Sequence, residues 1–273
     1  IDEFLTAICA IRKKAVVDRF FANYVPRRHQ FTDSYKYASI MRLDLKEHFR
    51  LTAFYLKYYD PREEILLGYD PGHFSSVVAA QERKQGTELR ILKEFTCYYP
   101  SQQPELAAAI HEFFGSDAKN KRIRLYYDRA GNKKKEDYEQ ITTDARLLKR
   151  ELESYGFSVE LMNEGQSTIY YWMQFKLLLL IFGEQSNSFP RVLVDENECP
   201  NLCSSIMLSP RKKTDGRIEL DKTSEKKVPI KYQAGLTTQL PSALIYLLHG
   251  LYYERMPSEY STMPDDLPDN MIL

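Results

Sequence analysis

Short apolar runs alternate with helical patterns along most of the chain. Three runs come first and end at turn-forming residues, which is typical of neighbouring antiparallel strands: 64–70, 75–81 and 88–98. Three later runs, separated by helical patterns, predict further strands: 122–128, 157–162 and 191–195. Strands that alternate with helices in this way favour an α/β fold with a mixed sheet flanked by helices.

Helices are predicted where apolar residues recur with a period near 3.6. The segments with this pattern are 105–114, 142–155, 168–182, 200–208 and 237–253. Pro104, Thr143 and Gly156 stand where helix start and stop signals are favoured. A polar loop is expected over 129–140, and the turn signal Thr214-Asp-Gly216 predicts a β-hairpin insertion within 209–232.

The two ends of the chain differ from this central part. Residues 3–24 carry a helical pattern closed by Pro26, and residues 27–62 mix polar and aromatic positions without a clear period. We therefore expect a helical lead-in or linker from a missing upstream region over 1–62 and the main domain over 63–255. The acidic, proline-containing segment 256–273 is expected to be a loose tail.

Composition excludes several classes of protein. The chain has 273 residues, of which 43% are hydrophobic and 28% charged, so it holds enough apolar material for a core. Four cysteines are too few for a disulfide-stapled secreted domain of this size. The longest aliphatic run is 177–182, too short for a membrane span, and no signal-peptide pattern opens the chain. An intracellular protein without membrane contact is expected.

Charge is balanced overall but uneven along the chain. There are 38 basic and 38 acidic residues. Segment 117–135 has eight Lys or Arg against two Asp, and segment 208–232 has eight basic residues against four acidic ones. Such local fields can attract a polyanion even when the net charge is zero.

Two aspartates, Asp70 and Asp128, end predicted strands at the point where the chain turns. In α/β sheets such strand ends line the functional crevice. Two carboxylates that converge there repel unless a cation lies between them, and hard ions such as Mg²⁺ or Mn²⁺ prefer oxygen ligands. A pair of such ions about 3.5–4 Å apart is a common device for phosphodiester hydrolysis. The alternative for each Asp taken alone is an ordinary turn or capping role.

The segments around these two aspartates resemble a known family. Gly68-Tyr-Asp-Pro-Gly72, with the residues that follow it to Val78, and Tyr126-Tyr-Asp-Arg-Ala130 resemble the nuclease portion of the large terminase subunit of tailed phages. Further segments continue the resemblance in the same order: 150–161, 191–202 and 235–248.

The resemblance implies a ribonuclease H-like fold and a metal-dependent endonuclease that cuts concatemeric double-stranded phage DNA during genome packaging. The family uses two divalent ions, Mg²⁺ or Mn²⁺, in the cytoplasm of the bacterial host. It also implies an upstream ATPase motor, a portal and a small terminase subunit as partners. The phosphate-loop pattern of such a motor does not occur in this sequence, so ATP hydrolysis is not assigned to it.

Carried over residue by residue, the resemblance makes Asp70 and Asp128 catalytic metal ligands. The third carboxylate of the family opens the last helix, where this chain has Ser242, a poor ligand for a hard dication. Asp195, which ends a predicted strand, is the first substitute, although a helix-capping role fits it equally well. Other substitutes are Glu196, Asp221 and His249.

Two basic clusters are candidates for DNA contact. The first is Lys133, Lys134 and Lys135, and the second is Arg211, Lys212 and Lys213. Phosphate contacts of this kind set register without reading sequence, whereas the alternative for each lysine is a solvated loop. Two other functions also fit: a resolvase- or transposase-like nuclease of the same fold, and a non-cleaving DNA-binding or motor-docking module with a degraded metal site.

Overall fold

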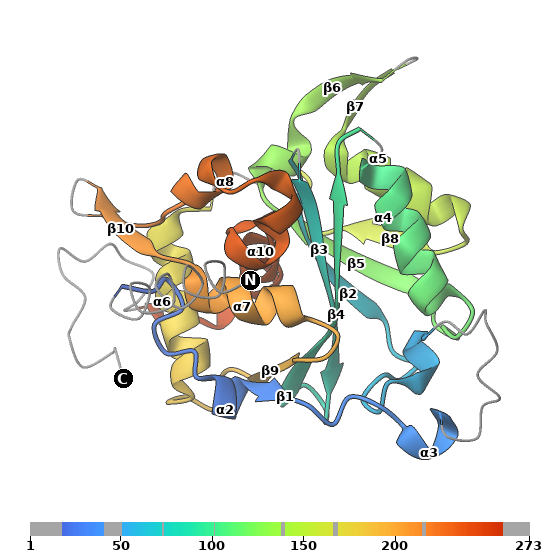
Figure 1. Cartoon of the computed structure of the whole chain (residues 1–273), viewed down its shortest axis with the longest axis horizontal. Coiled ribbons are helices and arrows are strands. Elements are labelled where there is room, and N and C mark those ends of the chain that lie inside the picture. Colours follow the sequence, from blue (N-terminus) through green and yellow to red (C-terminus); the bar gives the residue numbers. More distant parts are fainter. Residues whose placement is uncertain are drawn as a thin grey trace.

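The computed structural model describes residues 18–40, 51–72, 74–100, 102–137, 140–165, 169–214 and 217–258. Within them lies a seven-stranded sheet with the strand order β1–β9–β4–β3–β2–β5–β8 (Figure 1). Its strands are β1 (Gln30–Phe31), β2 (Ile65–Asp70), β3 (Phe74–Arg83), β4 (Glu88–Tyr98), β5 (Arg122–Tyr127), β8 (Ser158–Leu161) and β9 (Arg191–Asp195).

The sheet is mixed, as the sequence predicts. Strand β3 runs antiparallel to both of its neighbours, β2 and β4, and the other neighbouring strands pair in parallel. Consequently β2 and β5, which are far apart in the sequence, lie side by side and end at the same edge.

Helices cover both faces of this sheet (Figure 1). One face packs against α6 (Tyr171–Gly183), α7 (Pro200–Leu208) and α10 (Gln239–Tyr252), and the other against α4 (Gln102–Ile110) and α5 (Asp144–Ser154). The two cores alternate along β2, because Leu66 belongs to the first and Leu67 to the second. This alternation follows from the period of two in a strand.

Helix α10 lies directly on β2 because residue 68 is glycine. A Cβ atom at Gly68 would stand 2.1 Å from the carbonyl oxygen of Ala243 and 2.8 Å from Cβ of Leu247. Any larger residue at this position would push the helix off the strand. The close contact brings the first turn of α10 over the end of β2.

Smaller elements connect and extend these layers. They are α2 (Pro26–His29), α3 (Tyr37–Ile40), η1 (Ala53–Tyr55), the π-helix η2 (His111–Gly115), η3 (Arg129–Asn132), the hairpin β6 (Lys134–Asp137) with β7 (Gln140–Thr143), the hairpin β10 (Arg211–Thr214) with β11 (Arg217–Leu220), α8 (Thr223–Lys227), η4 (Ile230–Tyr232), α9 (Gln233–Leu236) and η5 (Tyr253–Arg255). The β10–β11 pair confirms the hairpin predicted within 209–232.

One predicted loop is wrong. The polar composition predicts a loop over residues 129–140, but they form η3 and the antiparallel β6–β7 pairing, which continues to Thr143. This hairpin escapes the sequence pattern because its strands carry no alternation of apolar and polar residues. The predicted cap is present, since Thr143 Oγ1 accepts a hydrogen bond from the N–H of Arg146 at the start of α5.

The described part of the expected lead-in belongs to the main core. Residues 1–17 lie outside the described residues, and residues 18–25 carry no helix, so the predicted helix does not extend to Pro26, which instead begins α2. Phe20 and Tyr24 are fully buried, and β1 extends the main sheet by pairing with β9. The acidic tail from residue 259 onward lies outside the described residues.

Candidate metal centre

Asp70 and Asp128 lie side by side at one edge of the sheet. Tyr69 of β2 pairs in register with Tyr127 of β5. Asp70 and Asp128 are the residues that directly follow these two tyrosines. Neighbouring parallel strands are about 4.8 Å apart, so the two backbones are at that spacing here. Asp128 remains extended, with φ −91° and ψ −179°, so both side chains leave on the α10 face of the sheet.

Asp70 is the buried member of the pair. Its side chain is 6% exposed, and no described residue donates a hydrogen bond to it or places a basic nitrogen within 4 Å. Burial, with repulsion from Asp128 and Glu225, raises the pKa of Asp70 to about 7, although Lys222 acts in the opposite direction. A buried carboxylate without a donor is costly, and a bound cation would remove that cost.

Asp128 is held in place by two neighbours. Its Oδ1 accepts a hydrogen bond of 2.7 Å from the N–H of Ala130 in η3. Its Oδ2 accepts a longer one, 3.4 Å, from the hydroxyl of Tyr246 on α10. The capping role considered for Asp128 is therefore real, but it occupies one oxygen and leaves the other facing α10.

Two buried hydroxyls face the same place. Ser76 pairs directly across the sheet from Asp70, so their side chains share a face. Ser242 lies one turn before Tyr246 and therefore on the same side of α10. Both hydroxyls are almost fully buried and make no well-formed hydrogen bond with the described residues.

Sequence reasoning missed two charged neighbours, Lys222 and Glu225. Both flank the start of α8, and their charges act on the pKa of Asp70. Lys222 lies within the basic segment 208–232, which was the one signal for it, but nothing in the sequence indicated that its charge acts on Asp70. Glu225 is fixed by the hydroxyl of Thr238, which donates to its carboxylate from the start of α10.

The donor set at this edge fits a hard divalent ion. Asp70 and Asp128 offer carboxylate oxygens, and Ser76 and Ser242 add neutral oxygens, all of which Mg²⁺ and Mn²⁺ accept. Within the described ranges, no group of three or more His, Cys, Asp or Glu side chains is positioned to hold a metal ion. The fit therefore rests on a carboxylate pair with further oxygen ligands.

Asp195, the expected third ligand, does not join the pair. It ends β9, which pairs with the first half of β4, so its place along the sheet is level with Leu92, whereas Asp70 is level with Thr96. Three strand spacings and four residues of rise separate the two aspartates by roughly 19 Å. We expected β2 and β9 to end at the same edge of the sheet. This is wrong, because β9 ends level with the middle of β4, whereas β2 continues to the level of Thr96.

Asp195 instead caps the turn after its strand. Its Oδ1 accepts hydrogen bonds from the Ser34 hydroxyl and from the backbone N–H groups of Asn197 and Glu198. The contacts therefore support the alternative, in which Asp195 is a capping residue.

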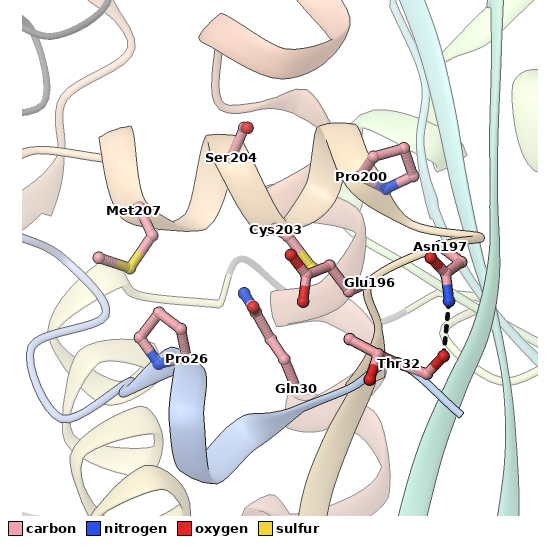
Figure 2. A pocket seen from close by; sticks show the side chains of 9 residues that line it. All are labelled: Pro26, Gln30, Thr32, Glu196, Asn197, Pro200, Cys203, Ser204 and Met207. Carbon is pink, nitrogen blue, oxygen red and sulfur yellow. Dashed lines mark hydrogen bonds between the residues drawn. The ribbon is translucent and has the colours of Figure 1, made fainter. Parts of the chain in front are cut away.

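Glu196 lines a cavity beside β1 and β9, the outermost strands on one side of the sheet (Figure 2). This cavity has a volume of about 660 Å³ and is lined by Pro26, Gln30, Thr32, Glu196, Asn197, Pro200, Cys203, Ser204 and Met207. Glu196 is the one charged residue in that set, and a single carboxylate is a poor site for a divalent ion. Glu196 therefore does not complete the pair.

The remaining substitutes have other roles. Asp221 accepts hydrogen bonds from the N–H and the hydroxyl of Thr223, and so begins α8. His249 lies two turns after Ser242 on α10 and stacks on Tyr253 at 4.6 Å. Burial alone lowers the pKa of His249 to about 4, which is the signature of a neutral core histidine.

The predicted DNA-binding residues lie on two hairpins. Lys133 is exposed directly after η3, and the backbones of Lys134 and Lys135 form the start of β6. Three basic residues form the second group in β10: Arg211, Lys212 and Lys213. Arg211 pairs with Asp18 at 3.1 Å and Lys212 with Glu219 at 3.4 Å.

No part of the described chain is a helix with the length and hydropathy that crossing a bilayer requires. No protein-family model matches the sequence, and no curated protein matches it.

Solved structures do resemble the chain. The large terminase of a thermophilic bacteriophage, in complex with ATP-γ-S, matches with a TM-score of 0.50 and 8% identity over 85% of this chain and 45% of that one. The large terminase nuclease of thermophilic phage G20c with bound cobalt matches with a TM-score of 0.47 and 11% identity over 85% of this chain and 97% of that one. The nuclease domain of the SPP1 large terminase with bound Mn has a TM-score of 0.41 and 13% identity, over 82% and 100% of the two chains.

These likenesses concern the fold. The chain spans less than half the length of the large terminase solved with ATP-γ-S, whose arrangement of helices and strands it shares over most of its own length. Together with the mixed sheet and its two helical layers, this confirms the α/β, ribonuclease H-like fold class expected from the sequence.

Proposed function

We propose that this chain is a metal-dependent endonuclease that cuts double-stranded DNA during phage genome packaging, with Asp70 and Asp128 as its metal ligands. One observation carries the proposal: the Asp70 carboxylate is buried and receives no hydrogen bond from a described residue, directly beside a second carboxylate. The sequence resemblance and the shared terminase fold both support this function.

The mechanism assigns distinct tasks to the residues of the chain. A divalent ion at this edge supplies Lewis-acid stabilisation of the charge that develops on the phosphate during hydrolysis. Asp70 and Asp128 would hold the ion, Tyr246 and the N–H of Ala130 orient Asp128, and the buried surroundings of Asp70 strengthen the electrostatic interactions of its carboxylate.

The proposed site also raises the question of how many divalent ions it binds. The resemblance implies two, but Ser242 stands in the place of the third carboxylate and Asp195 is remote. The described residues therefore supply anionic ligands for one ion, with Glu225 as a further carboxylate whose charge acts on Asp70.

DNA would reach the pair between the two basic hairpins. Lys133, Lys134 and Lys135 follow Asp128 closely in sequence, and the strand β10 is connected through β11 to the start of α8. Contacts of these lysines and of Arg211, Lys212 and Lys213 with phosphates would hold the duplex without reading its sequence.

Partners and location follow from the same resemblance. An ATPase motor, a portal and a small terminase subunit would act with this chain in the cytoplasm of the host cell. The large terminase that was solved with ATP-γ-S is more than twice as long as the part of it that this chain covers, and this supports a motor as partner.

Plasmid cleavage in the presence of Mn²⁺ tests the proposal. Asp70→Asn and Asp128→Asn should each reduce cleavage by at least about 100-fold, because both remove an anionic ligand of the ion. Asp33→Asn is the matched control, since Asp33 is 52% exposed and pairs with Lys57 instead. Cleavage that persists in Asp70→Asn would refute the assignment.

A non-cleaving DNA-binding or motor-docking module is the second candidate. The observation in its favour is Ser242, which leaves the described carboxylates without a three-ligand set. Calorimetric titration with Mn²⁺ separates the two, because a degraded site binds DNA but shows no Asp128-dependent metal binding. Preferential cleavage of branched DNA would instead point to a resolvase- or transposase-like nuclease.

A further inference from the structure

Lys222 is a basic residue whose charge acts on the carboxylate pair and which the mechanism above does not use. It lies between β11 and α8, and its side chain is 30% exposed. Figure 1 shows α8 beside α10, at the end of the sheet from which the β6–β7 hairpin also projects. Burial lowers the pKa of Lys222, but the charges of Asp70, Tyr171, Glu225 and Asp128 raise it above its ordinary value, so the ammonium keeps its charge.

The start of α8 is fixed on both sides of Lys222. Asp221 accepts two hydrogen bonds from Thr223, which shape the turn that precedes the helix. The Lys222 ammonium pairs with Glu225 at 3.7 Å, and Glu225 in turn accepts a hydrogen bond from Thr238 at the start of α10.

A second tie joins α8 to the segment before α10. The side-chain amide of Gln233 donates to the backbone carbonyls of Glu225 at 3.1 Å and Val228 at 3.0 Å. Because α10 lies tightly on β2 at Gly68, the ammonium is held in a fixed relation to the Asp70 carboxylate.

The charges at this edge define what else can bind. Asp70, Asp128 and Glu225 are anionic when ionised, and Lys222 offsets one of the three charges. One divalent ion neutralises the remainder. A second would leave the protein side of the site positive, and Glu225, the further carboxylate at this edge, already pairs with Lys222.

We propose that Lys222 takes the place of the second metal ion: the site binds one divalent cation, and the Lys222 ammonium supplies the other positive charge that faces the DNA phosphate. This inference rests on the proposed function and specifies how its site is built. An ammonium is a compact point charge with three donors, which suits a phosphate oxygen. A fixed cation at the developing negative charge lowers the barrier to hydrolysis without needing a metal ligand set.

The first test counts ions in the full chain. Calorimetry and electron paramagnetic resonance measure manganese binding. We expect them to show one Asp70-dependent Mn²⁺ for each chain. Lys222→Met should still bind Mn²⁺, and more tightly than the wild type, because the competing positive charge is gone. Two Asp70-dependent ions in the wild type would overturn the inference.

The second test measures plasmid cleavage at saturating Mn²⁺. Lys222→Met should lower the rate about 100-fold or more, and Lys222→Arg, which keeps the charge, should retain more of it. Lys149→Met is the matched control, because Lys149 lies on α5 at the other face of the sheet and pairs with Glu153. It should cleave like the wild type.

The outcomes separate this inference from the proposed function. Loss of metal binding in Asp70→Asn together with undiminished cleavage by Lys222→Met overturns the role of Lys222 alone. Metal binding that is unaffected by Asp70→Asn overturns the proposed site itself. Should Lys222→Met fail to fold, as judged by its thermal unfolding, the ion count of the wild type and the rate of Lys222→Arg decide the matter.

Discussion

At the scale of single residues, the Asp70 carboxylate carries an electrostatic cost that folding imposes. It is 6% exposed, lies beside Asp128 and has no described hydrogen-bond donor. In the unfolded chain the same carboxyl group is surrounded by water and titrates near its ordinary pKa. The folded protein therefore disfavours the charged form, unless a cation is bound.

This cost gives a prediction about stability and pH. The pKa of Asp70 is about 7 when folded and 3.8 in the reference state, so its favourable contribution is complete below about pH 4 and is lost as pH rises through 7. Without metal, Asp70→Asn should therefore be more stable than the wild type at pH 8, by up to about 4 kcal/mol, and not at pH 4.

Urea unfolding in EDTA at pH 4, 6 and 8 measures this difference. Added Mn²⁺ should stabilise the wild type at pH 8 and leave Asp70→Asn unchanged, because a ligand stabilises the state that binds it. A constant difference between the two proteins across this range would show that the Asp70 carboxylate is not desolvated.

His249 gives a prediction of the opposite sign. Burial lowers its pKa to about 4 from 6.5, so its contribution to stability is complete above about pH 6.5 and is lost as pH falls through 4. His249→Phe should therefore resist acid unfolding better than the wild type, with a gap of about 3 kcal/mol at the acid end. Thermal unfolding from pH 7 to pH 4 checks this, and equal acid sensitivity in both proteins would contradict it.

At the scale of elements, the contact between α10 and β2 determines the site. Tyr246 reaches Asp128, and Ser242 lies one turn before it, because Gly68 lets the helix backbone approach the strand. The aspartates themselves are aligned by the parallel pairing of β2 with β5.

Replacing Gly68 tests this contact. Gly68→Ala should destabilise the protein by about 1–3 kcal/mol and weaken Mn²⁺ binding, because the new Cβ clashes with Ala243 and Leu247. Gly72→Ala is the control, since its Cβ would meet no atom closer than 3.6 Å. Equal unfolding midpoints for both variants would show that the helix can move without cost.

Elements with a strong apolar period were predictable from sequence. β4 was predicted with its observed bounds, and β9 and α7 likewise. By contrast β1 has only two residues and exists through its pairing with β9, and α8 is a short polar helix held by contacts with the α9–α10 region.

The residues of the candidate site were predictable only where a strand pattern placed them. The Asp70 and Asp128 pair followed from two strand ends, because neighbouring parallel strands bring such positions together. Lys222, Glu225 and Tyr246 approach the pair from distant segments, through packing that no local pattern encodes. Asp195 was misplaced because strand length, rather than strand order, decides where an end lies.

At the scale of the whole molecule, a neutral chain concentrates positive charge on its hairpins. It has 38 basic and 38 acidic residues, yet Lys133 is exposed and β10 carries three consecutive basic residues. Such local charge can attract a polyanion to these hairpins even though the net charge is zero.

The salt dependence of DNA binding tests this distribution. Replacing Arg211, Lys212 and Lys213 with alanine should weaken binding to any duplex and reduce the slope of log K against log salt by about one unit for each phosphate that is no longer neutralised. The total reduction should be below three, because Arg211 and Lys212 already have acidic partners. An unchanged slope would place the DNA elsewhere.

The most direct test of the central claim is anomalous diffraction from crystals soaked in Mn²⁺. We predict one strong manganese peak at the carboxylates of Asp70 and Asp128. Carboxylates that point apart with no peak between them, or a peak only at Asp195 or Glu196, would contradict this assignment.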